Sequence, residues 1–224
     1  MSPVRINDNK NIVIFVLQWT QLPESCRGPI IRYSSQPGPA SQPKMQPVKV
    51  VITHLELTPG DFRPKRSDRT DVAFSHVNPP MPELNRFFYM TVGAQWFWLD
   101  RRSWTLAQWT EKVANKDRIE TWIMSASGVP AGYVEIEQKG GGVVEIDYMG
   151  LLHSFIGRGL GAHLLTSAIE RALGMGAARV LLNTCNLDHP KARANYEARG
   201  FKAVRTEVKT KELPTATPGP WEGA

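Results

Sequence analysis

A glycine-rich turn at residues 157–161 is the feature that most constrains how this chain can fold. It follows an apolar, alternating stretch at residues 143–149 and leads into an amphipathic segment that begins near Gly159. This pattern predicts a strand, a tight turn and a helix, because glycine adopts left-handed backbone conformations without steric cost. The first amides of such a helix lack intrahelical partners and lie at the positive end of its dipole. The turn is therefore predicted to bind a phosphate or pyrophosphate group.

Two familiar phosphate-binding motifs do not fit this turn. Gly157, Gly159 and Ala162 approximate a dinucleotide fingerprint, but no acidic residue ends the next predicted strand to hold a ribose. The Gly-Lys-Ser/Thr sequence of a P-loop is absent. The turn is therefore predicted to bind a different phosphate-bearing ligand.

The rest of the chain from residue 48 onward alternates strand-like and helix-like patterns. Strands are predicted at residues 48–57, 119–125, 131–138, 143–149, 178–183 and 201–208, and helices at residues 82–98, 103–113, 159–174 and 189–199. Ser103 is the expected cap of the second helix, and residues 61–80 are expected to be a loop. This order predicts an α/β (α+β) fold, with a mixed, mostly antiparallel central sheet and helices on both faces.

Residues 1–44 differ in composition from the rest of the chain. A short apolar run at residues 12–17 is followed by a stretch rich in Pro, Ser, Gly and Gln. The run is shorter than the roughly 20 residues of a membrane span, and no convincing signal cleavage pattern follows it. We expect residues 1–44 to be a disordered or misassigned N-terminal extension, with translation starting at Met45. A domain is expected over residues 45–210, followed by a flexible tail over residues 211–224.

Charge and cysteine content narrow the class of protein. The net charge is +6, but half of the excess falls before residue 45, and the basic residues between 63 and 69 alternate with acidic ones. Nucleic-acid binding is therefore not expected. The two cysteines, Cys26 and Cys185, lie in different sequence contexts, which argues against a stabilising disulfide and fits a reducing cytoplasm. No metal-ligand spacing occurs, so no metal is expected.

Two motifs at a fixed distance carry a family resemblance. Residues 156–161 read Ile-Gly-Arg-Gly-Leu-Gly, and a second pattern comprises Ala192, Tyr196, Gly200 and Phe201. They resemble the acetyl-CoA motif Gln/Arg-x-x-Gly-x-Gly/Ala and the closing pattern Asn-x-x-Ala-x-x-x-Tyr-x-x-x-Gly-Phe of the GNAT superfamily of N-acetyltransferases. Ile156 and His189 replace the usual Gln or Arg and the usual Asn. The resemblance covers residues 143–201 and extends loosely to about residue 48.

The resemblance implies an acyl-CoA N-acyltransferase fold and a direct reaction. Such enzymes move the acetyl group of acetyl-CoA, a co-substrate, to a primary amine within a ternary complex. Backbone groups after the fourth strand of the family bind the pantetheine arm, and the glycine turn binds the pyrophosphate. The residues that the resemblance assigns to acetyl-CoA binding are Leu151, Leu152, His153, Gly157, Arg158, Gly159, Gly161 and Ala162.

The resemblance also implies two catalytic roles. In the family the second-motif tyrosine protonates the departing CoA thiolate, a role that falls to Tyr196. A tyrosine at this position can alternatively serve only to pack the helix against the sheet. Glu145 is the candidate general base, because residues 145–151 resemble the strand that carries a glutamate base in histone-acetylating members. Asp147 lies two residues along the strand, hence on the same face, and is one alternative. A water chain without a dedicated base is the other.

The acceptor is not specified by the sequence. Aromatic residues gather in the predicted two-helix region, residues 82–113, which builds the acceptor pocket in this family; most are expected in the core, and one or two to wall the substrate. The expected partners are an amine acceptor on a small molecule or protein, with a homodimer among the possible assemblies and no nucleic acid or membrane. The competing hypothesis is an acyl-CoA-binding sensor or scaffold without turnover.

Overall fold

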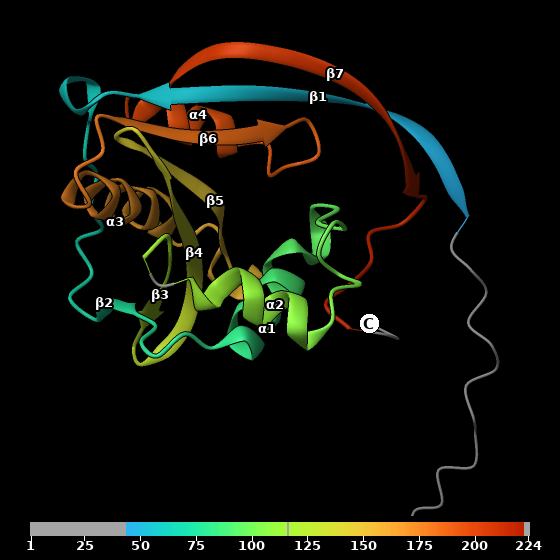
Figure 1. Ribbon diagram of the computed structural model, residues 1–224, viewed down its shortest axis with the longest axis horizontal. Helices are drawn as coiled ribbons and strands as arrows, with labels where there is room; N and C mark the ends of the chain where they lie inside the picture. The colour runs from blue at the N-terminus through green and yellow to red at the C-terminus, as the bar shows by residue number, and fades with distance from the viewer. Residues whose placement is uncertain (1–43, 116, 222–224) are drawn as a thin grey trace, which may run out of the picture. The chain divides into compact units, whose positions relative to one another are not determined.

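Seven strands form a single sheet in the computed structural model, which describes residues 44–115 and 117–221 (Figure 1). The sheet order is β2-β3-β4-β5-β6-β1-β7. The strands are β1 (Met45–Leu57), β2 (Val72–His76), β3 (Ile119–Ala126), β4 (Val129–Gly140), β5 (Val143–Leu151), β6 (Arg179–Cys185) and β7 (Lys202–Pro214). The segment 1–43, predicted to be part of a disordered or misassigned extension, lies outside the described residues.

Within the described residues, four α-helices accompany the sheet: α1 (Pro82–Val92), α2 (Leu106–Ala114), α3 (Leu160–Gly174) and α4 (Ala192–Ala198). Short 3-10 turns occur at Pro59–Asp61, Gly93–Gln95 and His153–Phe155. The predicted mixed, mostly antiparallel sheet is confirmed, because β5 and β6 are parallel whereas every other pair of neighbouring strands is antiparallel.

Helices cover both faces of the sheet, as predicted. Successive residues of a strand point to opposite faces, so the contacts of two neighbouring residues on β4 identify the helix that covers each face of the sheet. Val134 packs in the cluster that contains Leu165 of α3, whereas Tyr133 packs with Phe88 of α1. Residues 131–137 of β4 are accordingly all buried, which places β4 at the centre of the core.

The structure corrects the prediction of a continuous loop at residues 61–80. Residues 72–76 form β2, which pairs antiparallel with β3 at the edge of the sheet. The strand has only five residues and lies beside polar segments, so its pattern does not stand out in the sequence.

The structure also corrects the ends of the first two helices. α1 ends at Val92 rather than Trp98, because the side chain of Trp98 folds back onto Gly93, within 2.5 Å of where a Cβ of that glycine would lie. α2 begins at Leu106, and its cap is Thr105 rather than Ser103. Thr105 Oγ1 accepts from the Gln108 amide at 3.4 Å and Gln108 Oε1 accepts from the Thr105 amide at 2.8 Å, which forms a capping box.

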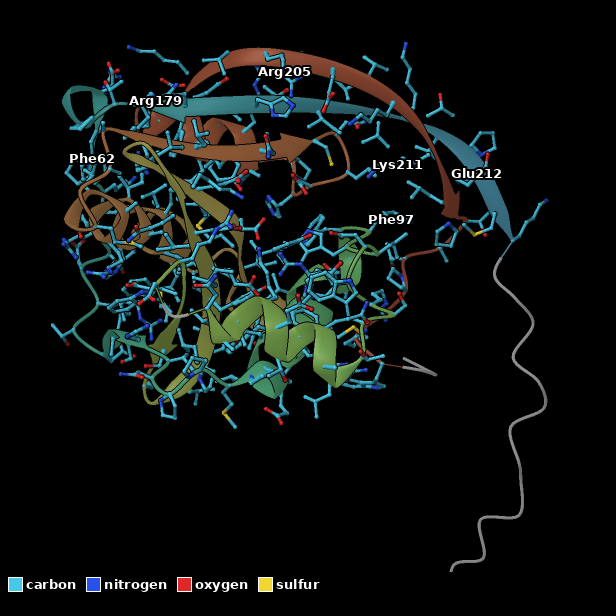
Figure 2. All side chains as sticks on the ribbon, in the orientation of Figure 1. Phe62, Phe97, Arg179, Arg205, Lys211 and Glu212 are labelled. Carbon is cyan, nitrogen blue, oxygen red and sulfur yellow. The ribbon has the colours of Figure 1, made fainter. Side chains whose placement is uncertain are left out.

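β1 and β7 form a long two-stranded arm. They pair from Met45 opposite Pro214 to Glu56 opposite Lys202, whereas β6 pairs only with residues 52–57 of β1. The arm extends past the end of β6 and carries charged side chains such as Arg205 and Lys211 (Figures 1 and 2). The predicted end of the last strand at residue 208 was therefore wrong, and residues 211–214, expected to begin a tail, belong to β7.

Three further findings apply to the part of the chain that the structure describes. No helix in that part is both long enough and apolar enough to cross a membrane. No cluster of three or more His, Cys, Asp or Glu side chains there is arranged to hold a metal ion. Cys185 is a free thiol, while Cys26 lies outside the described residues.

Candidate active site

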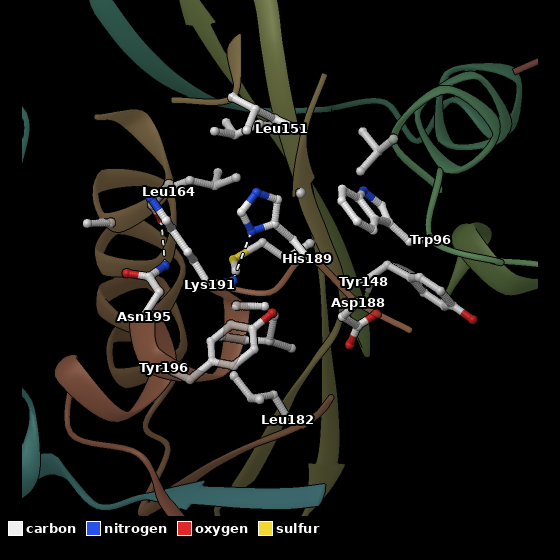
Figure 3. Close-up of a pocket in the computed structure, with 18 of the residues that line it drawn as sticks. Trp96, Tyr148, Leu151, Leu164, Leu182, Asp188, His189, Lys191, Asn195 and Tyr196 are labelled. Carbon is white, nitrogen blue, oxygen red and sulfur yellow. Dashed lines mark hydrogen bonds between the residues drawn. The ribbon is translucent and has the colours of Figure 1, made fainter. Parts of the chain in front are cut away.

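A cavity of about 550 Å³ opens where β5 and β6 separate (Figure 3). The two parallel strands pair only as far as Ile146 opposite Leu182, and both of these residues line the cavity. Beyond them β5 continues to Leu151 and β6 to Cys185 without pairing with each other. The gap left in the sheet is closed at one end by the start of α3 and α4, and at the other by the end of α1 and the turn that follows it.

A β-bulge at Asp147 interrupts β5 beside this cavity. Ile136 of β4 pairs with Ile146 while Glu135 pairs with Tyr148, so Asp147 is an extra residue without a partner in the ladder. A bulge interrupts the alternation of side chains between the two faces of a strand. Asp147 and Tyr148 both line the cavity, as do all residues of β5 from Ile146 to Leu151.

The glycine turn has the backbone conformation that the sequence predicts. Gly157 and Gly159 have φ angles of 81° and 77°, in the left-handed region, and Gly159 is the N-cap of α3. A Cβ at either position would meet nothing within 4 Å, so backbone conformation rather than crowding calls for glycine here. Gly157, Gly161 and Ala162 line the cavity, which brings the first amides of α3 to its wall.

Tyr196 lies on α4, at the same end of the cavity as the start of α3. Its ring packs against the main core cluster, with its centroid 6.3 Å from that of Phe201, and it lines the cavity. Burial raises the pKa of the Tyr196 phenol well above its ordinary value, and the charge of the nearby Asp188 adds to the shift. The phenol therefore stays protonated and able to donate over the physiological range.

Of the ten residues predicted for the site, the structure brings five together around the cavity: Leu151, Gly157, Gly161, Ala162 and Tyr196. Glu145, Leu152, His153, Arg158 and Gly159 are not among the lining residues. The amide of Leu152 donates to the carbonyl of Ala131 and its side chain packs near Phe88, while His153, Arg158 and Gly159 are exposed. The roles predicted for all ten residues remain predictions.

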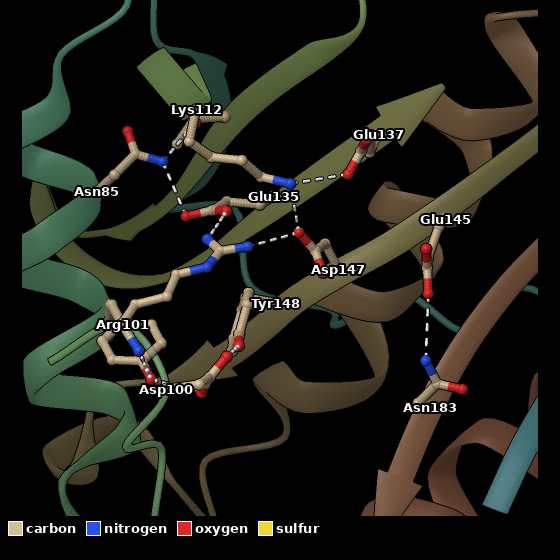
Figure 4. Close-up of polar contacts among 12 residues, drawn as sticks. Asn85, Asp100, Arg101, Lys112, Glu135, Glu137, Glu145, Asp147, Tyr148 and Asn183 are labelled. Atoms are coloured by element: carbon tan, nitrogen blue, oxygen red, sulfur yellow. Dashed lines mark hydrogen bonds and ion pairs between the residues drawn. The ribbon is translucent and has the colours of Figure 1, made fainter. Parts of the chain in front are cut away.

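Glu145 lies next to the cavity and is engaged by polar neighbours (Figure 4). One carboxylate oxygen is 2.8 Å from Lys139 Nζ, and the other accepts from Asn183 Nδ2 at 3.1 Å. Asn183 itself lines the cavity. Glu145 is thus one side chain removed from the cavity wall.

Asp147 belongs to a chain of ion pairs behind the cavity (Figure 4). Arg101 donates to Asp147 at 2.7 Å and to Glu135 at 2.6 Å, and Lys112 Nζ lies 3.0 Å from Asp147. Arg101 and Glu135 are nearly inaccessible, with exposed fractions of 5% and 0%. The Arg101 guanidinium also lies 4.2 Å from the ring centroid of Tyr148, so the segment after α1 fixes both Asp147 and Tyr148.

Aromatic side chains form the wall next to α1. Phe88, Tyr89 and Trp109 are fully buried in the core, whereas Trp96 and Trp98 line the cavity. Trp98 meets Tyr148 edge to face with ring centroids 4.9 Å apart, and Trp96 meets His189 in the same way at 5.3 Å. Only three of the eight aromatic residues in this region are buried, and Phe87 is exposed, so the expectation that most of them pack in the core was wrong. Two of the eight line the cavity.

Sequence reasoning missed Asp188, Lys191 and Asn195, all of which line the cavity. Asp188 directly precedes the second motif, and its place just after β6 is the signal that could have identified it. Asn195 Nδ2 donates to the carbonyl of Gly161 at 3.2 Å, which ties α4 to the first turn of α3.

The residues around the cavity fall within a match to a known protein family. A family model described as "Acetyltransferase (GNAT) family" matches residues 80–201. The glycine turn, the separated strands and Tyr196 all fall within this range. A search among curated proteins finds none that matches.

Several solved structures share the fold. A GCN5-related N-acetyltransferase from Kribbella flavida aligns with a TM-score of 0.54 and 20% identity, over 78% of this chain and 60% of that one. A GCN5-related N-acetyltransferase from Sphaerobacter thermophilus aligns with a TM-score of 0.57 and 17% identity, over 79% of this chain and 55% of that one. The chain thus spans little more than half the length of these relatives. On the family match and the shared fold, this chain belongs to the GNAT acetyltransferase family.

Proposed function

We propose that this protein transfers the acetyl group of acetyl-CoA directly to a primary amine in a ternary complex. The observation that carries the proposal is a single cavity that joins the glycine turn of α3 to Tyr196 on α4. The glycine turn would then bind the pyrophosphate, and Tyr196 would protonate the sulfur, of one acetyl-CoA molecule held in the gap between β5 and β6.

The residues around the cavity suit acetyl-CoA. The left-handed glycines and the free amides at the start of α3 can bind a pyrophosphate. The end of β5 pairs with β4 on one side but not with β6 on the other, so its open side, with Leu151 on the cavity wall, offers backbone groups to an extended arm with amides. Bound acetyl-CoA would supply a thioester, an acetyl group activated for attack by an amine.

The opposite end of the cavity suits an acceptor with an apolar body. Trp96 and Trp98 wall this end, and Tyr148 lies beside them. Such walls can stack on a ring or on a cationic amine. Tyr196 would protonate the sulfur as the bond between carbon and sulfur breaks.

The proposal is tested with the full-length protein, acetyl-CoA and a panel of amines. The panel comprises an aminoglycoside, a polyamine, an amino acid and a lysine-containing peptide. We expect thiol release that depends on one class of acceptor, together with a product heavier by one acetyl group in mass spectrometry. Tight binding of acetyl-CoA without acceptor-dependent thiol release would instead favour the sensor.

A further inference from the structure

An acceptor amine must lose a proton before its nitrogen can attack a carbonyl carbon. An alkylamine has a pKa near 10 and arrives mostly as the ammonium ion. Among the described residues that line the cavity, three carry an oxygen or nitrogen atom suited to accept this proton: Asp147, Asp188 and His189. Their surroundings distinguish them.

Asp147 is committed to two cations. Its Oδ2 accepts from Arg101 at 2.7 Å and lies 3.0 Å from Lys112 Nζ. Transfer of a proton to this carboxylate would leave Arg101 and Lys112 facing a neutral acid. Oδ2 of Asp147 is thus already held by two donors of the protein, which leaves it less available to an acceptor amine than an oxygen without a partner.

His189 has no lone pair left for an amine. Its Nδ1 accepts from the backbone amide of Lys191 at 3.1 Å. In a neutral imidazole the other nitrogen then carries the hydrogen, so Nε2 acts as a donor. His189 can donate a hydrogen bond into the cavity, but it cannot take a proton from the acceptor in this arrangement.

Asp188 is in a different position. One oxygen, Oδ2, accepts from Thr184 Oγ1 at 2.7 Å and from the Cys185 amide at 2.9 Å, and the described residues offer no partner to the other oxygen. No Lys, Arg or His among these residues forms an ion pair with it. Burial raises the pKa of the Asp188 carboxyl, against the opposing effect of these two hydrogen bonds. Figure 3 shows the carboxylate beside the cavity, between Tyr196 and Tyr148.

We propose that Asp188 is the catalytic base that takes a proton from the acceptor amine. This inference rests on the proposed acetyl transfer. The free carboxylate oxygen takes one proton from the ammonium and passes it to solvent. The nitrogen lone pair then forms the bond to the carbonyl carbon, the bond from that carbon to sulfur breaks, and Tyr196 gives its proton to the sulfur. The second proton lost by the nitrogen restores the Tyr196 phenol through solvent.

The test compares four variants of the full-length protein with the wild type, using the acceptor that the panel identifies. D188N keeps an oxygen that can accept from Thr184 and Cys185 but cannot take a proton at neutral pH. If D188N does not fold, D188S is used in its place. E145Q tests the base that the family resemblance implies, and D68N makes the same chemical change at an exposed aspartate that does not line the cavity.

The readouts separate catalysis from binding and folding. For D188N we expect kcat to fall about 10²- to 10⁴-fold, the range typical of general bases, with the Kd for acetyl-CoA unchanged in calorimetry. The wild-type kcat should rise with pH as the base ionises, and this acid limb should be absent in D188N. Other titratable groups on the cavity wall also bear on how kcat depends on pH, and these are Asp147, Tyr148, His189, Lys191 and Tyr196. The thiol of Cys185 lies beside Asp188.

The outcomes are distinct. A D188N enzyme with wild-type kcat and an unchanged acid limb would overturn the assignment while leaving acetyl transfer intact. Loss of the acid limb in E145Q and not in D188N would give the role to Glu145. Absence of acceptor-dependent thiol release in the wild type would defeat the proposed function itself, and the base assignment with it.

Discussion

Gly200, the glycine of the second motif, has a position where both backbone conformation and packing require glycine. Its φ is 107°, and a Cβ built there would lie 1.9 Å from the carbonyl oxygen of Asp61. The backbone after β1 rests on this glycine, and the Arg63 amide donates to the Arg199 carbonyl at 3.0 Å. The glycine thus lets the segment between β1 and β2 pack against the end of α4.

We expect Gly200→Ala to lower the free energy of unfolding by at least about 2 kcal/mol, because it adds a backbone clash to an unfavourable φ. Urea denaturation measures this change. Gly174→Ala is the matched control, since a Cβ at Gly174 meets nothing within 4 Å and its φ is not positive. Equal denaturation midpoints for the two variants would contradict the argument.

Tyr196 gives a second prediction at this scale. Tyr196→Phe removes only the hydroxyl, so we expect the kcat for acetyl transfer to fall about 10²-fold or more while acetyl-CoA binding is retained. Steady-state kinetics with the acceptor from the panel measures the effect. Tyr133→Phe is the control, because the Tyr133 hydroxyl is buried without a partner among the described residues and does not line the cavity. A purely structural Tyr196 would leave kcat unchanged.

Single residues differ in how far the sequence predicted them. Tyr196 and the glycines were identified from the spacing of two motifs, which is kept in this chain even though Ile156 and His189 depart from them. The expectation that Glu145 and Asp147 share one strand face assumes strict alternation, and the bulge at Asp147 breaks that alternation. Asp188 belongs to no periodic pattern, because a loop fixes its direction through the bonds from Thr184 and Cys185.

Among the elements, α2 illustrates how local signals compete at a helix start. Ser103 and Thr105 are both common caps, and only Thr105 has Gln three residues later. The reciprocal bonds between Thr105 and Gln108 determine where the helix begins. This helix carries Lys112, which contacts Asp147, so its start also positions part of the charge behind the cavity.

We expect Thr105→Ala to cost about 1 kcal/mol of stability, because the N-terminal amides of α2 lose their acceptor. Thermal unfolding followed by circular dichroism measures the loss. Ser103→Ala is the control and should change stability by less than half as much, since Ser103 makes no side-chain bond to the helix amides. A larger loss for Ser103→Ala would restore the cap that the sequence predicts.

The elements themselves were predictable where the pattern was long. The strands around the turn and α3 carry enough alternating or amphipathic residues to be recognised from the sequence. β2 has only five residues and depends on pairing with β3 for its conformation. The early end of α1 depends on a contact between Gly93 and Trp98 that helix propensity does not encode.

For the molecule as a whole, ligand binding should be coupled to stability through the gap in the sheet. CoA at about 100 times its Kd should stabilise the fold by roughly 2.7 kcal/mol, or roughly 5–10 °C in Tm for a domain of this size. Differential scanning fluorimetry measures this shift.

Ala162→Glu is the control for the CoA effect. Ala162 is half-buried on the cavity wall, so the variant should fold, while its carboxylate should repel a pyrophosphate and abolish the shift. A full Tm shift in this variant would place the CoA phosphates away from the start of α3.

The position of β1 in the sheet has a consequence for synthesis on the ribosome. β1 pairs only with β6 and β7, which occupy residues 179–185 and 202–214. At roughly 5–20 residues per second, the nascent strand waits on the order of ten seconds for its neighbours to emerge. During that interval β1 lacks both strands that pair with it, and Leu55 and Leu57 lack the part of their core cluster that is still to be made, namely Val180, Leu182 and Phe201. Nascent chains stalled before residue 179 should therefore be the form of this protein most dependent on chaperones.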